Sequence, residues 1–317
     1  MLLIKKKQMC LFFVILLNVL GQNYAADLRL YDGSLTNYRQ VSLSDSATLI
    51  PYIDANKDVF LFAPGYQNDP DNGTAVKTVM STFLQTNKTA MLLNWKTEAN
   101  SILGYCDTVR KSQTVAKDLA NALVKLIQAG MNPDITLVGH SLGATLLGLT
   151  GRYTQQKNVT IPWLYALDAA RLLCSLYPQV DKTSGRTVVF VRTDPGGMGT
   201  NESTAHVDHR PNNGEYVTSS GSRLQPGCNK SYSPQEVASA GNRCSHDCAW
   251  RYFCEALVDS ARLILGQART WFDFVAKNGT FTTTNYLWPV DPSKQGLFYC
   301  TTSASAPYGK GEQGLYP

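Results

Sequence analysis

The segment that most constrains the fold spans residues 134–144, in which an apolar, β-branched run leads into Gly139-His140-Ser141-Leu142-Gly143. The small apolar segment 144–149 that follows is typical of a helix. A strand, a tight turn and a helix in this order hold a serine hydroxyl exposed at the apex of the turn, with glycine on both sides because a side chain there would collide with strand or helix. We therefore expect Ser141 to be a nucleophile that needs a base and an orienting acid elsewhere. A chance match in a glycine-bearing turn is the alternative.

Apolar runs at residues 58–63, 90–95, 161–167 and 187–191 predict further strands, and helical periodicity appears at residues 76–84, 115–127 and 249–265. Strands that are apolar on both faces and alternate with helices predict a mostly parallel sheet covered by helices on both sides. Residues 193–243 have the composition of long loops, and residues 281–286 and 297–302 are candidates for edge strands. Active sites of such sheets lie beyond the carboxyl ends of the strands, where both Ser141 and Asp168 fall.

Residues 1–25 predict a signal peptide, because three lysines precede an apolar run too short to span a bilayer and small residues follow it. Residues 26–317 would then form a single exported domain, since no repeat or linker divides them. The formal charge of +5 includes three lysines of the signal peptide and is +2 without them. This small charge predicts no nucleic-acid partner, and no clustered basic patch indicates attraction to anionic lipids.

Cysteines and glycosylation sequons support export. The seven cysteines after the signal peptide predict up to three disulfides and one thiol that is free or pairs between chains. Cys248 and Cys254 are not expected to pair with each other, because six helical residues separate them by about 9 Å. Six Asn-x-Ser/Thr sequons predict a secreted glycoprotein. They are Asn72, Asn87, Asn158, Asn201, Asn229 and Asn278.

The chain has only four histidines from which to choose a base. His140 adjoins Ser141, and its side chain would leave the turn in another direction. His206 and His209 lie in a turn-rich loop, where either could be a base or simply brace the loop. His246 lies between two cysteines at the entry to a helix, where a disulfide would fix its backbone. Because a base must be positioned to a fraction of an ångström, the pattern favours His246.

Asp168 directly follows a buried apolar run, one strand beyond Ser141, so it is the expected acid that orients the histidine. Its alternative role is an N-cap for residues 169–173. The resulting order of serine, aspartate and histidine is that of α/β-hydrolases. Cys244, His246 and Cys248 are also zinc-type ligands, but export favours oxidised cysteines and no second cysteine pair completes four ligands. We therefore predict no metal and no cofactor.

These residues resemble the pancreatic lipase family of secreted α/β-hydrolases, in particular its short insect members and the phospholipases A1. The resemblance implies a catalytic triad of Ser141, Asp168 and His246, and an oxyanion hole formed by the backbone N–H groups of Leu142 and Tyr66. It runs from residue 59 to residue 311 and rests on six motifs. They are Gly139 to Ala144, Leu167-Asp168, 205–208 with 211–214, 226–228, Cys244-Ser245-His246, and 296–299 with 307–309.

The chain also departs from the family pattern. Pro64-Gly65 and Arg192-Thr193-Asp194 replace the usual His-Gly and His-Thr-Asp, and Asp247-Cys248 replaces a small residue and an arginine. Residues 169–174 lack the acidic residues that bind calcium in the family, so no calcium is expected. The resemblance pairs Cys228 with Cys244 as the staple of a lid-like loop of 15 intervening residues, which is shorter than in triglyceride lipases.

The functional expectation is a secreted serine carboxylic ester hydrolase that acts on lipids, of the lipase or phospholipase A1 type, at a membrane or emulsion surface. We expect no C-terminal lipid-binding domain after Pro317 and therefore no colipase partner. The alternative is a non-catalytic lipid- or hormone-binding protein of the same fold, similar to the yolk storage proteins.

Overall fold

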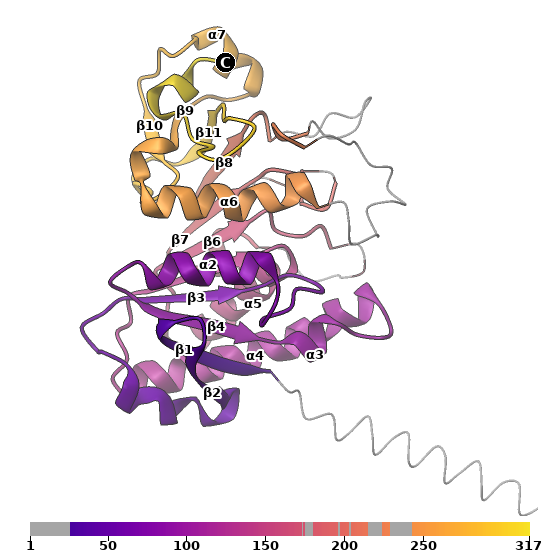
Figure 1. Ribbon diagram of the computed structural model, residues 1–317, viewed down its shortest axis with the longest axis vertical. Helices are drawn as coiled ribbons and strands as arrows, with labels where there is room; N and C mark the ends of the chain where they lie inside the picture. The colour runs from indigo at the N-terminus through magenta and orange to yellow at the C-terminus, as the bar shows by residue number, and fades with distance from the viewer. Residues whose placement is uncertain are drawn as a thin grey trace, which may run out of the picture.

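The computed structural model describes residues 26–172, 174, 180–195, 197–202, 204–214, 224–228 and 243–317 (Figure 1). The predicted signal peptide, nearly all of the predicted lid-like loop and the sequon at Asn229 lie outside these residues.

A twisted sheet of 11 strands forms the centre of the protein, in the order β10-β9-β11-β8-β7-β6-β5-β3-β4-β1-β2. The strands from β4 to β11 in this order run parallel, and antiparallel strands flank them at both edges. This mostly parallel sheet with helices on both faces is the predicted α/β-hydrolase fold. The strands are β1 (Asp27–Ser34), β2 (Asn37–Ser42), β3 (Val59–Ala63), β4 (Thr89–Asn94), β5 (Ile135–His140), β6 (Trp163–Leu167), β7 (Thr187–Val191), β8 (Val207–Pro211), β9 (Ile264–Gln267), β10 (Thr284–Tyr286) and β11 (Gly296–Cys300).

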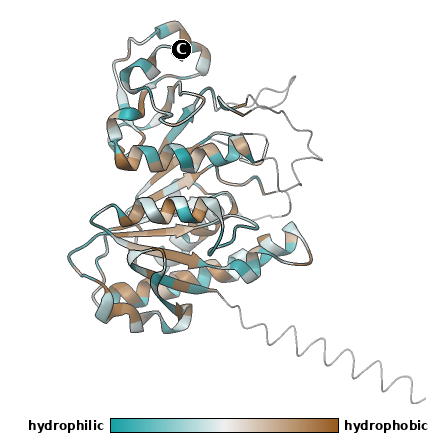
Figure 2. Ribbon diagram, viewed as in Figure 1, coloured by the Kyte–Doolittle hydropathy of each residue, from teal (hydrophilic) through white to brown (hydrophobic). Residues whose placement is uncertain are grey.

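Two helices cover each face of this sheet, and alternate side chains of the buried strands point toward opposite faces. Leu61 of β3 packs in the cluster that includes α4 and α5, whereas Phe60 and Phe62 pack in the cluster that includes α2 and α6. Figure 2 shows the largely apolar strands between helices in which apolar and polar residues alternate. The helices are α2 (Thr74–Leu84), α3 (Lys96–Ala99), α4 (Tyr105–Gln128), α5 (Leu142–Gln155), α6 (Cys244–Val258) and α7 (Trp271–Lys277), and the short 3-10 helices are Leu43–Tyr52, Lys182–Ser184, Ser260–Arg262 and Gly311–Leu315.

The predicted helix at residues 249–265 is wrong at its carboxyl end. α6 ends at Val258, and Asp259 takes an extended backbone conformation while its side chain accepts a hydrogen bond from the amide of Ala261. Ile264 and Leu265 then enter the sheet as part of β9. The helical spacing of apolar residues continues beyond Val258 because β9 also buries apolar side chains. This spacing alone could therefore not locate the end of the helix.

Two other predictions from composition need correction. The segment 193–243 was expected to be loops, but it contains the fully buried strand β8. β8 reads Val-Asp-His-Arg-Pro, and Asp208 is buried because it pairs with Arg210 and with Arg192, which directly follows β7. An apolar pattern cannot reveal such pairing. The segment 297–302 was expected at an edge, but β11 lies inside the sheet between β8 and β9. β1 and β2 were not predicted, and α4 begins ten residues before the predicted helix, at Tyr105.

The seven cysteines after residue 25 form two disulfides and leave three buried thiols, fewer bridges than the maximum of three. The predicted Cys228–Cys244 bridge is confirmed, and Cys106 pairs with Cys174. Cys248 and Cys254 do not pair with each other, as expected from their spacing along the helix, and both are free thiols together with Cys300. Among the residues described, no helix is both long enough and apolar enough to cross a membrane.

Candidate active site

Ser141 lies at a sharp turn between β5 and α5, with the unusual backbone angles φ 57° and ψ −128°. The flanking glycines are needed sterically. A Cβ atom at Gly139 would lie 2.4 Å from the Cα of Ala144, and one at Gly143 would lie 2.1 Å from the carbonyl oxygen of Ala63. Real Cβ atoms do not approach backbone atoms this closely. The strained turn predicted from the pentapeptide is therefore the observed one.

The loop after β3 packs directly against this turn. A Cβ atom at Gly65 would lie 2.7 Å from the Cβ of Ser141, so only glycine allows the loop to come this near. Tyr66, one of the two predicted oxyanion donors, follows Gly65. Leu142, the other, is the first residue of α5, and its N–H has no acceptor within the helix. The two predicted donors therefore flank Ser141 from two different segments.

Asp168 and His246 form a buried hydrogen-bonded pair. Nδ1 of His246 lies 2.5 Å from Oδ2 of Asp168, and each residue is about 1% exposed. Asp168 follows β6, and the preceding carbonyl of Leu167 accepts a hydrogen bond of 3.0 Å from the amide of Ser141. The turn that holds Ser141 and the strand end that holds Asp168 are thus joined directly.

The second oxygen of Asp168 is also held. Its Oδ1 accepts hydrogen bonds from the amides of Thr193, at 2.9 Å, and Asp194, at 3.1 Å. Gly199 packs so closely that a Cβ atom there would lie 2.6 Å from Oδ1. The carboxylate therefore has one fixed orientation, which leaves Oδ2 directed at His246.

The environment of His246 favours a strong base. Burial by itself lowers the pKa of this imidazole, but the hydrogen bond and the negative charge of Asp168 outweigh burial, and the pKa is raised above its ordinary value. With Nδ1 bound to Asp168, Nε2 is the free ring nitrogen. It is buried and has no hydrogen-bond partner among the residues described. This is the nitrogen that a general base would use.

The other three histidines are placed differently. His140 packs against the ring of His246 at 4.5 Å between centroids, and its Nε2 lies 3.1 Å from the carbonyl oxygen of His246. Burial lowers the pKa of His140 to about 4, so it stays neutral. Nδ1 of His206 accepts a hydrogen bond from the amide of Val188, at the opposite edge of the sheet. His209 is buried within β8, and burial lowers its pKa to about 3.

Two arginines that sequence patterns did not assign to the site support it. Arg192 is 2% exposed, and its Nε lies 2.9 Å from both carboxylate oxygens of Asp208. Its Nη atoms donate to the carbonyls of Thr200 and Glu202, so it fixes the loop whose amides hold Asp168. The position of Arg192 could have indicated this role, because residues 192–194 directly follow a predicted strand and the active sites of such sheets lie beyond the strand ends.

The second of these arginines precedes α6. Nη1 of Arg243 donates to the carbonyl of Tyr66 at 3.3 Å, so it links the residues before His246 to the loop after β3.

The zinc alternative is excluded by the disulfide, because Cys244 is bonded to Cys228 and cannot be a thiolate ligand. Among the residues described, ligand-type atoms of Asp168, Asp194 and His246 do lie within 4.8 Å of one another. Both oxygens of Asp168 and the Nδ1 of His246 are, however, already engaged in the hydrogen bonds above. The arrangement fits a proton relay better than a metal site.

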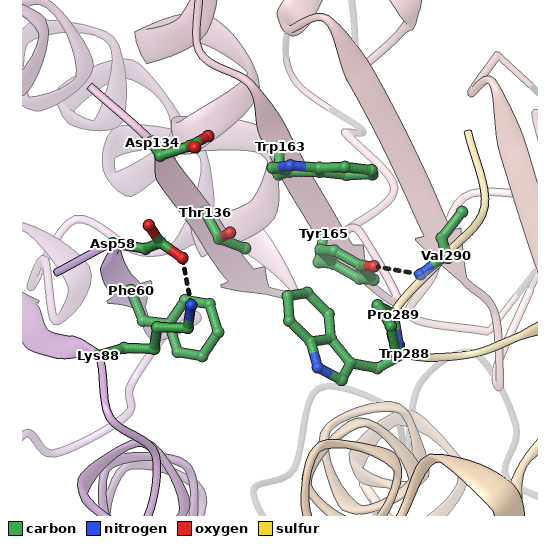
Figure 3. Close-up of a pocket in the computed structure, with 10 residues that line it drawn as sticks. All are labelled: Asp58, Phe60, Lys88, Asp134, Thr136, Trp163, Tyr165, Trp288, Pro289 and Val290. Carbon is green, nitrogen blue, oxygen red and sulfur yellow. Dashed lines mark hydrogen bonds and ion pairs between the residues drawn. The ribbon is translucent and has the colours of Figure 1, made fainter. Parts of the chain in front are cut away.

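A cavity of about 220 Å³ lies away from this cluster. Figure 3 shows it among Phe60, Thr136, Trp163, Tyr165 and Trp288, at the amino ends of β3, β5 and β6. Thr136 and Ser141 are separated by most of β5, roughly 16 Å at the usual rise along a strand. The cavity is therefore not part of the candidate active site.

A sequence profile of the family described as Lipase matches residues 22–282. The chain belongs to the Lipase family. Among its relatives, lipase member H-B of Xenopus laevis is 24% identical over 83% of this chain and 55% of its own length. The probable phospholipase A1 magnifin of Vespa magnifica is 28% identical over 65% and 58%, and human pancreatic triacylglycerol lipase is 23% identical over 70% and 49%. The chain thus matches about half the length of these Lipase family relatives, and the resemblance stated above is confirmed.

The asparagines of five of the six sequons lie among the described residues, and each is exposed, as attachment of a glycan would require. They are Asn72, Asn87, Asn158, Asn201 and Asn278.

Proposed function

We propose that the protein is a serine carboxylic ester hydrolase in which Ser141 attacks the ester carbonyl. His246 takes the proton of Ser141 on Nε2 and later gives it to the leaving alcohol. Asp168 holds His246 in the correct tautomer and stabilises the imidazolium. Water then hydrolyses the acyl-enzyme, with His246 again acting as the base. The observation that carries the proposal is the buried hydrogen bond of 2.5 Å between His246 and Asp168, directly beside the strained turn of Ser141.

The backbone N–H groups of Leu142 and Tyr66 would hold the negative oxygen of the tetrahedral intermediate. Their proximity to Ser141, through Gly65 and the start of α5, supports this role. Each such donor typically contributes about 3 kcal/mol to stabilising the transition state. The side chains at these two positions need not be polar, because backbone groups do the work.

The proposed substrates are lipid esters, of the phospholipid or triglyceride type. Membership of the Lipase family supports this class, and the relatives include both a probable phospholipase A1 and a pancreatic triacylglycerol lipase. The short predicted loop between Cys228 and Cys244 favours the phospholipase A1 type, because a shorter lid leaves a site more open. We further propose that residues 1–25 direct secretion and are removed.

The decisive assay compares wild type with Ser141→Ala on a short-chain chromogenic ester that is soluble in water. In a triad that acts as a unit, this change is expected to lower kcat by about 10⁶. His246→Ala should lose a similar factor. His206→Ala is the matched control, because this histidine is partly exposed at the opposite edge of the sheet, and its activity should stay close to that of wild type.

Equal and negligible turnover by wild type and Ser141→Ala would refute the proposal and favour the alternative of a lipid-binding protein. If wild type is active, phosphatidylcholine and triolein emulsions assayed side by side for the position of the released fatty acid assign the substrate type.

A further inference from the structure

The loop between α3 and α4 presents two adjacent large apolar side chains to solvent. Ile102 is 99% exposed and Leu103 is 73% exposed. Single exposed apolar residues are normal on a protein surface, but two neighbours at the apex of one loop form a small apolar protrusion. We call residues 101–104 the tip.

The tip lies beside the proposed active site. On one side of it, the carbonyl of Ala99 accepts a hydrogen bond of 3.2 Å from the amide of Gln67. On the other side, the ring of Tyr105 meets the ring of Tyr66 edge to face, with centroids 5.4 Å apart. Both contacts are made to the loop that packs against Ser141. In Figure 1 the link between α3 and α4 lies on the side toward which the arrow of β3 points, which is the side of the candidate site.

The tip is held firmly rather than loosely. The hydroxyl of Ser101 donates to the carboxylate of Asp107 and accepts a hydrogen bond of 3.3 Å from the amide of Leu103. The amide of Gly104 donates to the carbonyl of Ser101 at 3.0 Å, and Gly104 takes a left-handed conformation with φ 87°. These amides have partners within the loop, so the tip could enter an apolar medium without exposing them unpaired.

We propose that Ile102 and Leu103 insert into a lipid surface and hold the proposed active site against it. The inference rests on the proposed function, because it names the surface from which that site takes its substrate. A protrusion of two side chains is far smaller than the roughly 1,000 Å² that a specific protein interface needs. A lipid surface, in contrast, accepts an apolar protrusion of any shape, and interfacial segments bury their apolar side chains about 5–10 Å deep.

Binding to vesicles of dialkyl ether phosphatidylcholine, which an ester hydrolase cannot cleave, tests the proposal directly. The variant Ile102→Ser/Leu103→Ser should lower the partition coefficient at least about ten-fold, since burial of even one such side chain is worth about that factor. The matched control is Val258→Ser/Phe272→Ser, which removes two apolar side chains that are 65% and 80% exposed on other elements. It should bind like wild type.

Two further measurements separate this inference from the proposed function. Ser141→Ala should bind the vesicles like wild type, because insertion does not require turnover. The tip variant should hydrolyse a soluble short-chain ester like wild type while losing activity on vesicles of ester phospholipid. If wild type cleaves no ester but still needs the tip for binding, the proposed function fails and the docking surface stands. If the tip variant binds vesicles like wild type, or loses soluble ester turnover as well, the docking surface is refuted.

A variant that adds a fluorescent side chain to the tip gives a positive result that misfolding cannot imitate. Leu103→Trp keeps the tip apolar and adds a fluorophore. Lipids brominated in their acyl chains should quench the fluorescence that this tryptophan adds to that of wild type. Binding to vesicles without such quenching would contradict insertion.

Discussion

Gly143 offers a sharp test of how the turn at Ser141 is built. In Gly143→Ala the new methyl group would lie 2.1 Å from the carbonyl oxygen of Ala63 and 2.6 Å from that of Pro64. Both atoms belong to the backbone that leads to Tyr66, so rotation of a side chain cannot relieve the clash. The methyl group and this loop must separate by more than about 1 Å to reach an ordinary contact.

The expected consequence is a large loss of catalysis with a moderate loss of stability. A misplacement of about 1 Å at a catalytic group typically costs about 10²-fold in rate, and loss of one oxyanion donor costs about 10²–10³-fold. We therefore expect kcat on a soluble ester to fall at least about 10²-fold. Forcing a methyl group into a packed site should also lower the free energy of unfolding by about 1–3 kcal/mol.

Gly151→Ala is the matched control for this change. Gly151 lies in the same helix, and a Cβ atom there would lie 1.8 Å from the carbonyl oxygen of Ser184, remote from the turn. This variant should lose stability to a similar degree, yet keep kcat near the wild-type value when assayed well below its melting temperature. Wild-type kcat in Gly143→Ala, or an equal fall of kcat in both variants, would refute our account of the oxyanion loop.

Two further predictions concern the acid. In Asp168→Asn the burial that lowers the pKa of His246 stays, while the negative charge that helps to raise this pKa is lost. The acid limb of kcat/KM should therefore move to lower pH as kcat falls about 10⁴-fold. Because only the neutral base is active, an acid limb that stays in place or moves to higher pH would contradict this assignment. Arg192→Met should lower the free energy of unfolding by about 3–5 kcal/mol, because it breaks a fully buried ion pair with Asp208. Urea denaturation measures this change, and a loss below about 1 kcal/mol would show that Arg192 does not fix the loop around Asp168.

Patterns within short segments were enough to predict the strands that are buried on both faces. β3, β5, β6 and β7 were read from apolar runs because strands buried on both faces must be apolar throughout. The histidine was different. Sequence patterns favoured His246 but left His206 and His209 open as bases, and the resemblance to a known family then also pointed to His246.

The burial of polar side chains was the main feature that sequence patterns did not predict. β8 was taken for loop because its aspartate, histidine and arginine side chains are polar, yet Asp208 is buried through ion pairs with Arg210 and with Arg192, which follows β7. Such compensation depends on partners that are distant along the chain, so no pattern within β8 could reveal it.

The sequence alone determined the turn that holds Ser141, because its glycines, its strand and its helix are neighbours in the chain. Only the tertiary structure decided which side chains meet there. Asp168 and His246 are separated by 78 positions, and His140, Arg192 and Arg243 gained supporting contacts that their own neighbours in sequence do not suggest. The physical reason is that backbone conformation follows local sterics, whereas a proton relay depends on where a folded sheet brings the ends of its strands together.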